Sequence, residues 1–295
     1  MAADPFAPLV TRVIDGTLYS RATTPYAFDV RVHALGHGHT EAIVMPRHAW
    51  HEVDHLSAGA QADYLDCVKN PATLTRLELL NKATCNRARS TRRARTKVRR
   101  LAKWKGLTVL LTLTYRENML DRARMARDFD VFVKRVRRVV TGFEYICVFE
   151  QQKRGAWHAH IAVRRVLSHY MHQGSMVRSY DLLRSMWRGI VGADNGNVDV
   201  SRNKRVNRSS AKLAAYLSKY IGKSFGGNEK HVNAYSSSGR DLPPAIVERI
   251  MTSEVHGAVK ALFALVTEDL CAGAEVHQAF LDGGGYYLCL SPPGR

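Results

Sequence analysis

One short stretch constrains the fold of this chain more than any other: Trp157-His158-Ala159-His160-Ile161, which follows Phe143–Glu150 across the turn Gln151–Gly155. Both flanking stretches are rich in aromatic and β-branched residues, and the turn contains glycine, so the pattern predicts a β-hairpin. Residues i and i+2 of a strand point to the same face. His158 and His160 therefore present two imidazoles on one side of the predicted hairpin.

A carboxylate can complete a set of metal ligands in this hairpin. If the turn is centred on Arg154, Glu150 stands directly opposite His158, with Cβ atoms about 4.5 to 5.5 Å apart. Glu150, His158 and His160 are therefore candidate ligands for one cation that keeps open coordination positions. A His-x-His pair alone is weak evidence, because two surface histidines are the commoner explanation. The opposed acid favours metal binding.

A second element supplies candidate nucleophiles. A helix is predicted over residues 209–221, because the stretch lacks Pro and Gly, is rich in Ala and Leu, and is followed by Gly222. Two tyrosines lie one turn apart on this helix, and each is followed at the third position by a lysine: Tyr216 with Lys219, and Tyr220 with Lys223. Lysine can favour the phenolate or bind phosphate. For the helix alone, burial of both tyrosines beside solvated lysines is the favoured alternative.

Three motifs together resemble a known family, the rolling-circle replication initiators of the HUH endonuclease class, especially the phage-type and plasmid-type replication-associated proteins with two tyrosines. Leu111–Tyr115 is similar to the first motif of that family, Glu150 with Arg154–His160 to its second, and Tyr216–Lys223 to its third. The motifs occur in the initiator order, whereas relaxases place the tyrosine before the histidines. The resemblance covers roughly residues 105–225 and leaves both ends of the chain unexplained.

The resemblance implies a metal-dependent endonuclease and strand transferase that nicks single-stranded origin DNA. A divalent ion, Mg²⁺ or Mn²⁺, would bind at Glu150, His158 and His160 and polarise the scissile phosphate. Tyr216 or Tyr220 would attack phosphorus, leaving a 5′-phosphotyrosine and a free 3′-hydroxyl that primes synthesis. The two tyrosines would alternate in successive rounds. Lys219 and Lys223 would orient phosphate, while a separate helicase and polymerase would act on the nicked DNA.

Charge independently favours a polyanionic partner. The chain carries 44 Lys and Arg against 26 Asp and Glu, a net charge of +18, which is the electrostatic pattern of nucleic-acid binding. Residues 87–105 hold ten basic residues and no acid, and a second basic run, 202–212, precedes the tyrosines. Such runs are usually solvated helix faces, but phosphate contacts are a common use. The candidate DNA-binding residues are Arg92, Arg93, Arg95, Arg99, Arg100, Arg154, Arg205 and Arg208. A non-catalytic DNA-binding regulator is the alternative from another functional class.

The middle of the chain predicts an α+β fold. A strand over 106–115, a helix over 121–140, the hairpin, a helix over 180–190 and a strand over 197–201 follow one another. This β-α-β-β-α-β order predicts a ferredoxin-like (RRM-like) antiparallel sheet with helices on one face, followed by the tyrosine-bearing helix.

The domain division expected from these patterns has three parts. They are an N-terminal region with the arginine-rich run (1–104), the endonuclease domain (105–225) and a C-terminal region of unknown role (226–295). With no long apolar stretch and no leader-like N-terminus, a cytoplasmic protein without membrane attachment is expected.

Two rival motifs point to other chemistry. His51-Glu52-Val53-Asp54-His55 matches the His-Glu-x-x-His spelling of zinc proteases, in which a helix brings two histidines together. Asp54 departs from the uncharged inner pair of that family, and peptide hydrolysis does not explain a net charge of +18. Gly222-Lys223-Ser224 ends like a phosphate-binding loop, but Leu217 stands where that loop needs glycine. Neither motif therefore carries the assignment.

Overall fold

The computed structural model describes residues 10–15, 17–53, 59, 62, 76–201, 209–224, 233, 235–239, 241–270 and 273–293, with the backbone alone for 76–79, 81, 82 and 222–224. The chain forms two compact units that interleave along the sequence. Unit 1 comprises residues 1–34, 40–86 and 243–291, and unit 2 comprises 35–39, 87–242 and 292–295. The mixed α+β class with antiparallel sheets is confirmed. The three-part division at residues 104 and 225 stays a prediction.

Unit 2 contains the elements in the order expected from the sequence. They are β4 (Val109–Tyr115), α3 (Arg122–Arg137), β5 (Tyr145–Gln151), β6 (Trp157–Val163), α4 (Ser179–Val191) and β9 (Gly196–Ser201). The sheet order is β10-β5-β6-β4-β9, with β10 (Ser236–Ser237) at the edge and every pair antiparallel. A small hairpin of β7 (His169–His172) and β8 (Ser175–Arg178) precedes α4.

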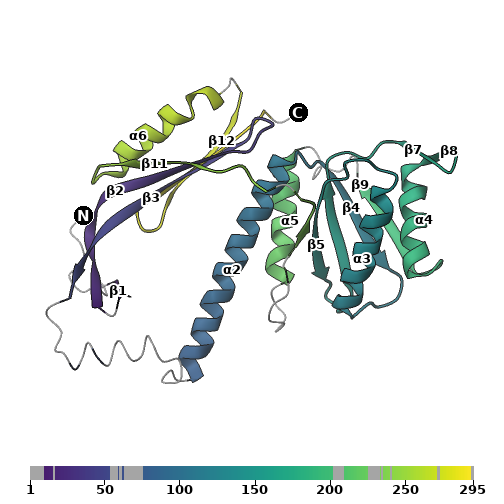
Figure 1. The fold of residues 1–295 in the computed structure, drawn as a ribbon, viewed down its shortest axis with the longest axis horizontal. Helices are drawn as coiled ribbons and strands as arrows, with labels where there is room; N and C mark the ends of the chain where they lie inside the picture. The colour runs from purple at the N-terminus through teal and green to yellow at the C-terminus, as the bar shows by residue number, and fades with distance from the viewer. Residues whose placement is uncertain are drawn as a thin grey trace. The chain divides into compact units, whose positions relative to one another are not determined.

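One face of this sheet packs against α3 and α4 (Figure 1). Alternate residues of β4 point toward the helices, as the period of a strand requires, and Leu111 and Leu113 are fully buried there. Phe132 of α3 meets Trp187 of α4 edge to face, with ring centroids 5.8 Å apart. This larger core fixes the positions of β5 and β6.

The opposite face is also covered. It packs against α5 (Ser210–Ser224) and the last turns of α2 (Arg76–Trp104). Val98 and Leu101 of α2 and Leu217 of α5 are at most 2% exposed in this second core. The expectation of helices on one face followed by a tyrosine helix is therefore incomplete, because the arginine-rich helix also buries an apolar side. That side was hidden in the sequence by the basic residues around it.

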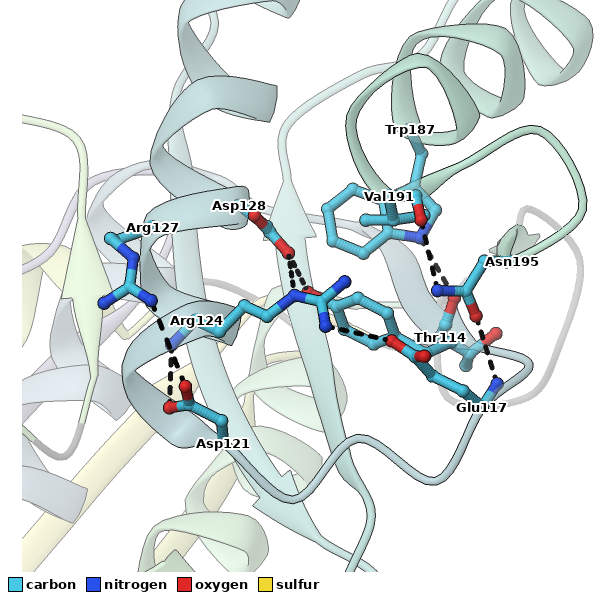
Figure 2. Close-up of polar contacts among 10 residues, drawn as sticks. Thr114, Glu117, Asp121, Arg124, Arg127, Asp128, Trp187, Val191 and Asn195 are labelled. Atoms are coloured by element: carbon cyan, nitrogen blue, oxygen red, sulfur yellow. Dashed lines mark hydrogen bonds and ion pairs between the residues drawn. The ribbon is translucent and has the colours of Figure 1, made fainter.

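The loop that leaves β4 is tied down by a network of polar contacts (Figure 2). The backbone N–H of Arg124 donates to Asp121 at 3.0 Å, which caps the start of α3. The guanidinium of Arg124 pairs with Glu117 at 3.3 Å and with Asp128 at 3.7 Å. Trp187 Nε1 of α4 donates to the carbonyl of Thr114 at 3.0 Å. The end of β4 is therefore held by α3 and α4 together.

Unit 1 joins both ends of the chain in one sheet. Its strands are β1 (Thr11–Ile14), β2 (Thr17–Ala34), β3 (Thr40–Glu52), β13 (Gly285–Ser291) and β12 (Glu275–Leu281) in that order, and β11 (Ile246–Ile250) pairs with β2. The helix α6 (Val255–Leu265), followed by the short 3₁₀ helix η3 (Thr267–Asp269), covers one face (Figure 1). Ala258 and Leu262 of α6 are fully buried against Val30 and Val44.

The structure bears on the protease-like motif and on membrane insertion. His51 and Glu52 lie at the end of β3, so their side chains point to opposite faces of a strand rather than lining one side of a helix. Asp54 and His55 lie outside the described residues. Across the described ranges, no helix combines the length and apolarity needed to cross a membrane.

Candidate active site

The hairpin of β5 and β6 has the register predicted from the sequence. Glu150 stands opposite His158, and Val148 stands opposite His160. The turn closes through two backbone hydrogen bonds of 2.8 Å, from Gln152 N to the carbonyl of Ala156 and from Gly155 N to the carbonyl of Gln152. Gly155 adopts a φ of +89°, which L side chains rarely tolerate. The predicted pairing of the carboxylate and the first imidazole is therefore confirmed.

The three candidate ligands lie on the face of the sheet that packs against α5. Along β5, Ile146 and Val148 are fully buried on this face, and Glu150 follows two residues later. Along β6, Ala162 is fully buried on the same face, and His160 and His158 follow toward the turn. The apolar core under α5 therefore becomes a polar patch at the hairpin end of the sheet.

Each imidazole in this patch is held through its Nδ1 atom. The side-chain amide of Gln152 lies 3.2 Å from Nδ1 of His158, and the hydroxyl of Thr112 lies 3.3 Å from Nδ1 of His160. His160 Nε2 donates to Glu150 Oε2 at 2.8 Å. His158 Nε2 is buried and has no hydrogen-bond partner among the described residues. Both rings are thus oriented from one side, as protein metal sites orient their histidines.

These residues fit a divalent cation, although they do not yet surround one. Within the described part of the chain, no three His, Cys, Asp or Glu side chains are already arranged as ligands, and Glu150 and His160 are bonded to each other. The unpartnered Nε2 of His158 is the observation that favours an ion, because a buried polar atom without a partner costs about 1–3 kcal/mol. A cation at this position would also replace the hydrogen bond between Glu150 and His160.

The two tyrosines of α5 lie beside this patch. Leu213, Leu217 and Ile221 are fully buried at intervals of four residues, and they fix which side of α5 faces the sheet. Tyr216 and Tyr220 are half-buried at the edge of that side. The sequence-based expectation that both lie on one helix face is confirmed by their ring contact, with centroids 4.9 Å apart.

Both tyrosine rings also contact His160. The Tyr220 ring stacks on the imidazole with centroids 4.4 Å apart and an interplanar angle of 15°. The Tyr216 ring meets the same imidazole edge to face at 6.2 Å. The alternative in which the tyrosines pack only into an apolar core is therefore disfavoured, because both rings touch a candidate metal ligand.

Burial shifts the ionisation of two groups in the site. The pKa of His158 is lowered by burial and by the neighbouring charges of His160 and Arg154, against a smaller opposite effect of Glu150. Its imidazole is therefore kept neutral, as a metal ligand must be. The pKa of Tyr220 is raised above its ordinary value by burial and by the hydrogen bond with Tyr216. The phenol of Tyr220 therefore stays protonated without an ion beside it.

The remaining predicted residues differ in how they lie. Lys219 is exposed on α5, while the side chain of Lys223 and all of Arg205 and Arg208 lie outside the described residues. Arg154 is exposed at the tip of the hairpin turn and donates from Nε to Gln152 Oε1 at 3.2 Å. A hollow of about 730 Å³ opens here, lined by residues 150–154. Cationic side chains therefore stand at the mouth of the polar patch.

The arginine-rich run forms the exposed side of α2. Arg92, Arg93 and Arg95 are exposed, whereas Arg99 and Arg100 are half-buried. A hollow of about 380 Å³ runs along this side, lined by Arg92, Arg93, Thr96, Lys97, Arg100 and Leu242. Lys105 at the end of the run is buried instead, and it pairs with Glu144 at 3.5 Å. The run is therefore divided between a basic surface and a structural ion pair.

Two residues of the patch are not identified as parts of the site by the sequence patterns. Thr112 stands opposite His160 in the pairing of β4 with β6, and Gln152 reaches His158 from the turn. A signal for Thr112 exists, because Thr112 and Thr114 are polar at every second position of an otherwise apolar strand. Gln152 has no such signal, since any polar residue is compatible with a turn.

Comparison with known proteins adds one match. Searches of curated proteins and of solved structures found nothing that matches this chain. Residues 108–225, about two fifths of the chain, match the family model described as replication-associated protein, of the ORF2 and gene 2 protein type. The matched segment contains β4, the β5–β6 hairpin and α5, and the match supports a replication initiator.

Proposed function

We propose that this protein is a metal-dependent DNA endonuclease and strand transferase of the HUH type, which nicks a replication origin through a 5′-phosphotyrosine. The contact of Tyr216 and Tyr220 with His160 carries the proposal, because it brings two phenols to the candidate metal ligands. The family match over residues 108–225 supports the same role. The strand order β5-β6-β4-β9 is consistent with the ferredoxin-like arrangement that belongs to this proposal.

In this proposal Glu150, His158 and His160 bind Mg²⁺ or Mn²⁺. The ion supplies a Lewis acid that polarises the scissile phosphate. Gln152 can accept the Nδ1 proton of His158, because an amide offers both a donor and an acceptor, and this leaves the Nε2 lone pair for the ion. Thr112 orients His160 in the same way.

One tyrosine then attacks phosphorus. The new bond joins the phenolic oxygen to phosphorus, and the bond from phosphorus to the 3′ oxygen breaks, so that the DNA keeps a free 3′-hydroxyl. The covalent ester preserves the phosphodiester energy for later joining. With centroids 4.9 Å apart, Tyr216 and Tyr220 are close enough to serve alternately. Lys219 on the exposed side of α5 would contribute charge to phosphate binding.

A covalent adduct with DNA tests the proposal. The full chain is incubated with Mn²⁺ and labelled single-stranded DNA that contains the cognate origin, and the products are separated under denaturing conditions. A labelled protein band is expected for the wild type and for a Tyr115→Phe control, whose tyrosine lies in the core against Trp187. The band should disappear when Tyr216 and Tyr220 are both changed to Phe, and also in His158→Ala.

The same assay separates the enzyme from a non-catalytic regulator. A regulator would bind the DNA, measured by fluorescence anisotropy, without forming an adduct in any variant. An adduct that persists in the double Tyr→Phe variant would reject the assignment of the nucleophiles. A variant that forms no adduct but binds DNA as the wild type does would locate the defect in the chemical step.

A further inference from the structure

The sheet of unit 1 carries a cluster of arginines on the face opposite α6. Arg31, Arg47 and Arg249 gather around the carboxylate of Asp29 and are here called the arginine cluster. Arg47 Nη1 donates to Asp29 Oδ2 at 3.0 Å, Arg249 Nε donates to Oδ1 at 3.2 Å, and Arg31 Nη2 lies 3.9 Å from Oδ2. The cluster draws on β2, β3 and β11, whose pairing brings together residues up to 220 positions apart.

The geometry of the cluster places its positive charge outward. The Asp29 side chain is only 12% exposed, whereas the exposed fractions of Arg31, Arg47 and Arg249 are 54%, 39% and 54%. One carboxylate balances one of three guanidinium charges, so the cluster keeps an excess of two positive charges. Each guanidinium has five N–H donors in a rigid fork, and the contacts to Asp29 occupy few of them.

A purely structural role explains this arrangement poorly. A single guanidinium would neutralise Asp29, and exposed ion pairs contribute little to stability, about 0–1 kcal/mol. Three guanidiniums held in place by one shielded acid instead form a surface that complements phosphate, because the arginine fork matches phosphate oxygens. Tyr26 adds a 44% exposed aromatic side chain that is hydrogen-bonded to Arg47. Arginine beside an exposed aromatic residue is common in nucleic-acid binding surfaces.

We infer that the arginine cluster is a second contact site for the phosphate backbone of DNA, carried by unit 1 and built from residues outside the segment 108–225. The choice of DNA as the polyanion rests on the proposed function. The cluster would hold DNA without taking part in the chemistry. Its contribution to binding would be electrostatic and independent of DNA sequence.

The salt dependence of binding tests this inference. The full chain carrying Tyr216→Phe and Tyr220→Phe is titrated with fluorescent single-stranded DNA of arbitrary sequence at several NaCl concentrations, without divalent ions. For single strands, each phosphate that is no longer bound lowers the slope of log K against log salt by about 0.7, or about fivefold in affinity at 0.1 M salt. Arg31→Gln and Arg249→Gln should each show this loss, whereas Arg31→Lys should keep most of the slope.

Arg21→Gln is the matched control. Arg21 is exposed on the same strand, β2, ten residues before Arg31, roughly 30 Å away along an extended chain. Its removal should leave the slope unchanged. If Arg31→Gln and Arg249→Gln change the slope no more than Arg21→Gln does, the inference is wrong. Should Arg249→Gln unfold the sheet, Arg31→Gln decides, because the 3.9 Å contact of Arg31 is the weakest of the three.

Failure of this inference is distinguishable from failure of the proposed function. Adduct formation on a DNA just long enough to cover the cleavage site depends on Tyr216 and Tyr220, and Arg31→Gln in the otherwise wild-type chain should leave it intact. A normal adduct with an unchanged slope overturns the arginine cluster alone. A reduced slope in Arg31→Gln supports the cluster even if the wild type forms no adduct.

Discussion

His158 and His160 are one residue apart, yet the structure predicts very different costs for removing them from the metal-free protein. His160→Ala loses a hydrogen bond to the Glu150 carboxylate, about 1.5–3 kcal/mol, and the stacked ring of Tyr220, about 0.5–1.5 kcal/mol. Both groups of the hydrogen bond are about 10% exposed, so screening by solvent is limited. The total cost is about 2–4 kcal/mol, beyond the packing lost with the imidazole itself.

His158→Ala has a smaller cost, because the same change removes a group that lacks a partner. The variant loses the hydrogen bond with Gln152, about 1 kcal/mol. It also removes the buried Nε2 that has no partner among the described residues, a relief of about 1–3 kcal/mol. Loss of packing is common to both variants. His158→Ala should therefore be more stable than His160→Ala by about 2–3 kcal/mol when no metal is present.

Urea denaturation in EDTA measures this difference, followed by the fluorescence of Trp157 and Trp187, which are buried in unit 2. Mn²⁺ added at a hundred times its dissociation constant should then stabilise the wild type by about 2.7 kcal/mol and neither variant. His169→Ala, an exposed histidine on β7, should behave as the wild type in both buffers. Equal stability of the two variants in EDTA, or full Mn²⁺ stabilisation of either, would refute the reasoning.

Three further predictions concern the scaffold around the site. Gly155→Ala should destabilise the hairpin by about 1–2 kcal/mol in thermal denaturation, because φ is +89° and an added Cβ would lie 3.0 Å from Leu120 Cδ2. For Asp29, burial raises the pKa but the hydrogen bonds from its two arginine partners outweigh it, so the pKa lies below the ordinary 3.8. A carboxyl with a lowered pKa stabilises the fold above its unfolded pKa and loses that contribution as pH falls. The wild type should therefore lose stability below about pH 4, and Asp29→Asn should lack that component in melting curves from pH 3 to 7. Replacing Arg93 and Arg100 by Gln should lower the salt slope of single-strand binding by about 0.7 for each phosphate released, measured by anisotropy.

Much of unit 2 could be predicted from the sequence, because local patterns determine it. The strand and helix periods between residues 109 and 201 identified the element types in the correct order. Alternation along the hairpin was sufficient to place Glu150 opposite His158. Helical spacing placed Tyr216 and Tyr220 on one face. In each case the relevant partners are close in the chain or one turn apart.

The remainder depends on pairing between distant segments, which local patterns do not determine. The sheet of unit 1 joins β2 and β3 to β13 from the other end of the chain, and Arg249 meets Asp29 across 220 positions. The apolar side of α2, with Val98 and Leu101, was hidden among arginines. The stacking of Tyr220 on His160 follows from how α5 packs on the sheet, so the sequence could name both residues without showing their contact.

The most direct measurement of the central claim is the identity of the residue joined to DNA. The wild type is incubated with Mn²⁺ and the single-stranded origin, the DNA is digested, and the peptides are analysed by mass spectrometry. We expect a nucleotide attached through a 5′-phosphate to Tyr216, to Tyr220 or to both. A nucleotide attached to any other residue would contradict the account, as would formation of the same adduct when Glu150, His158 and His160 are all replaced by alanine.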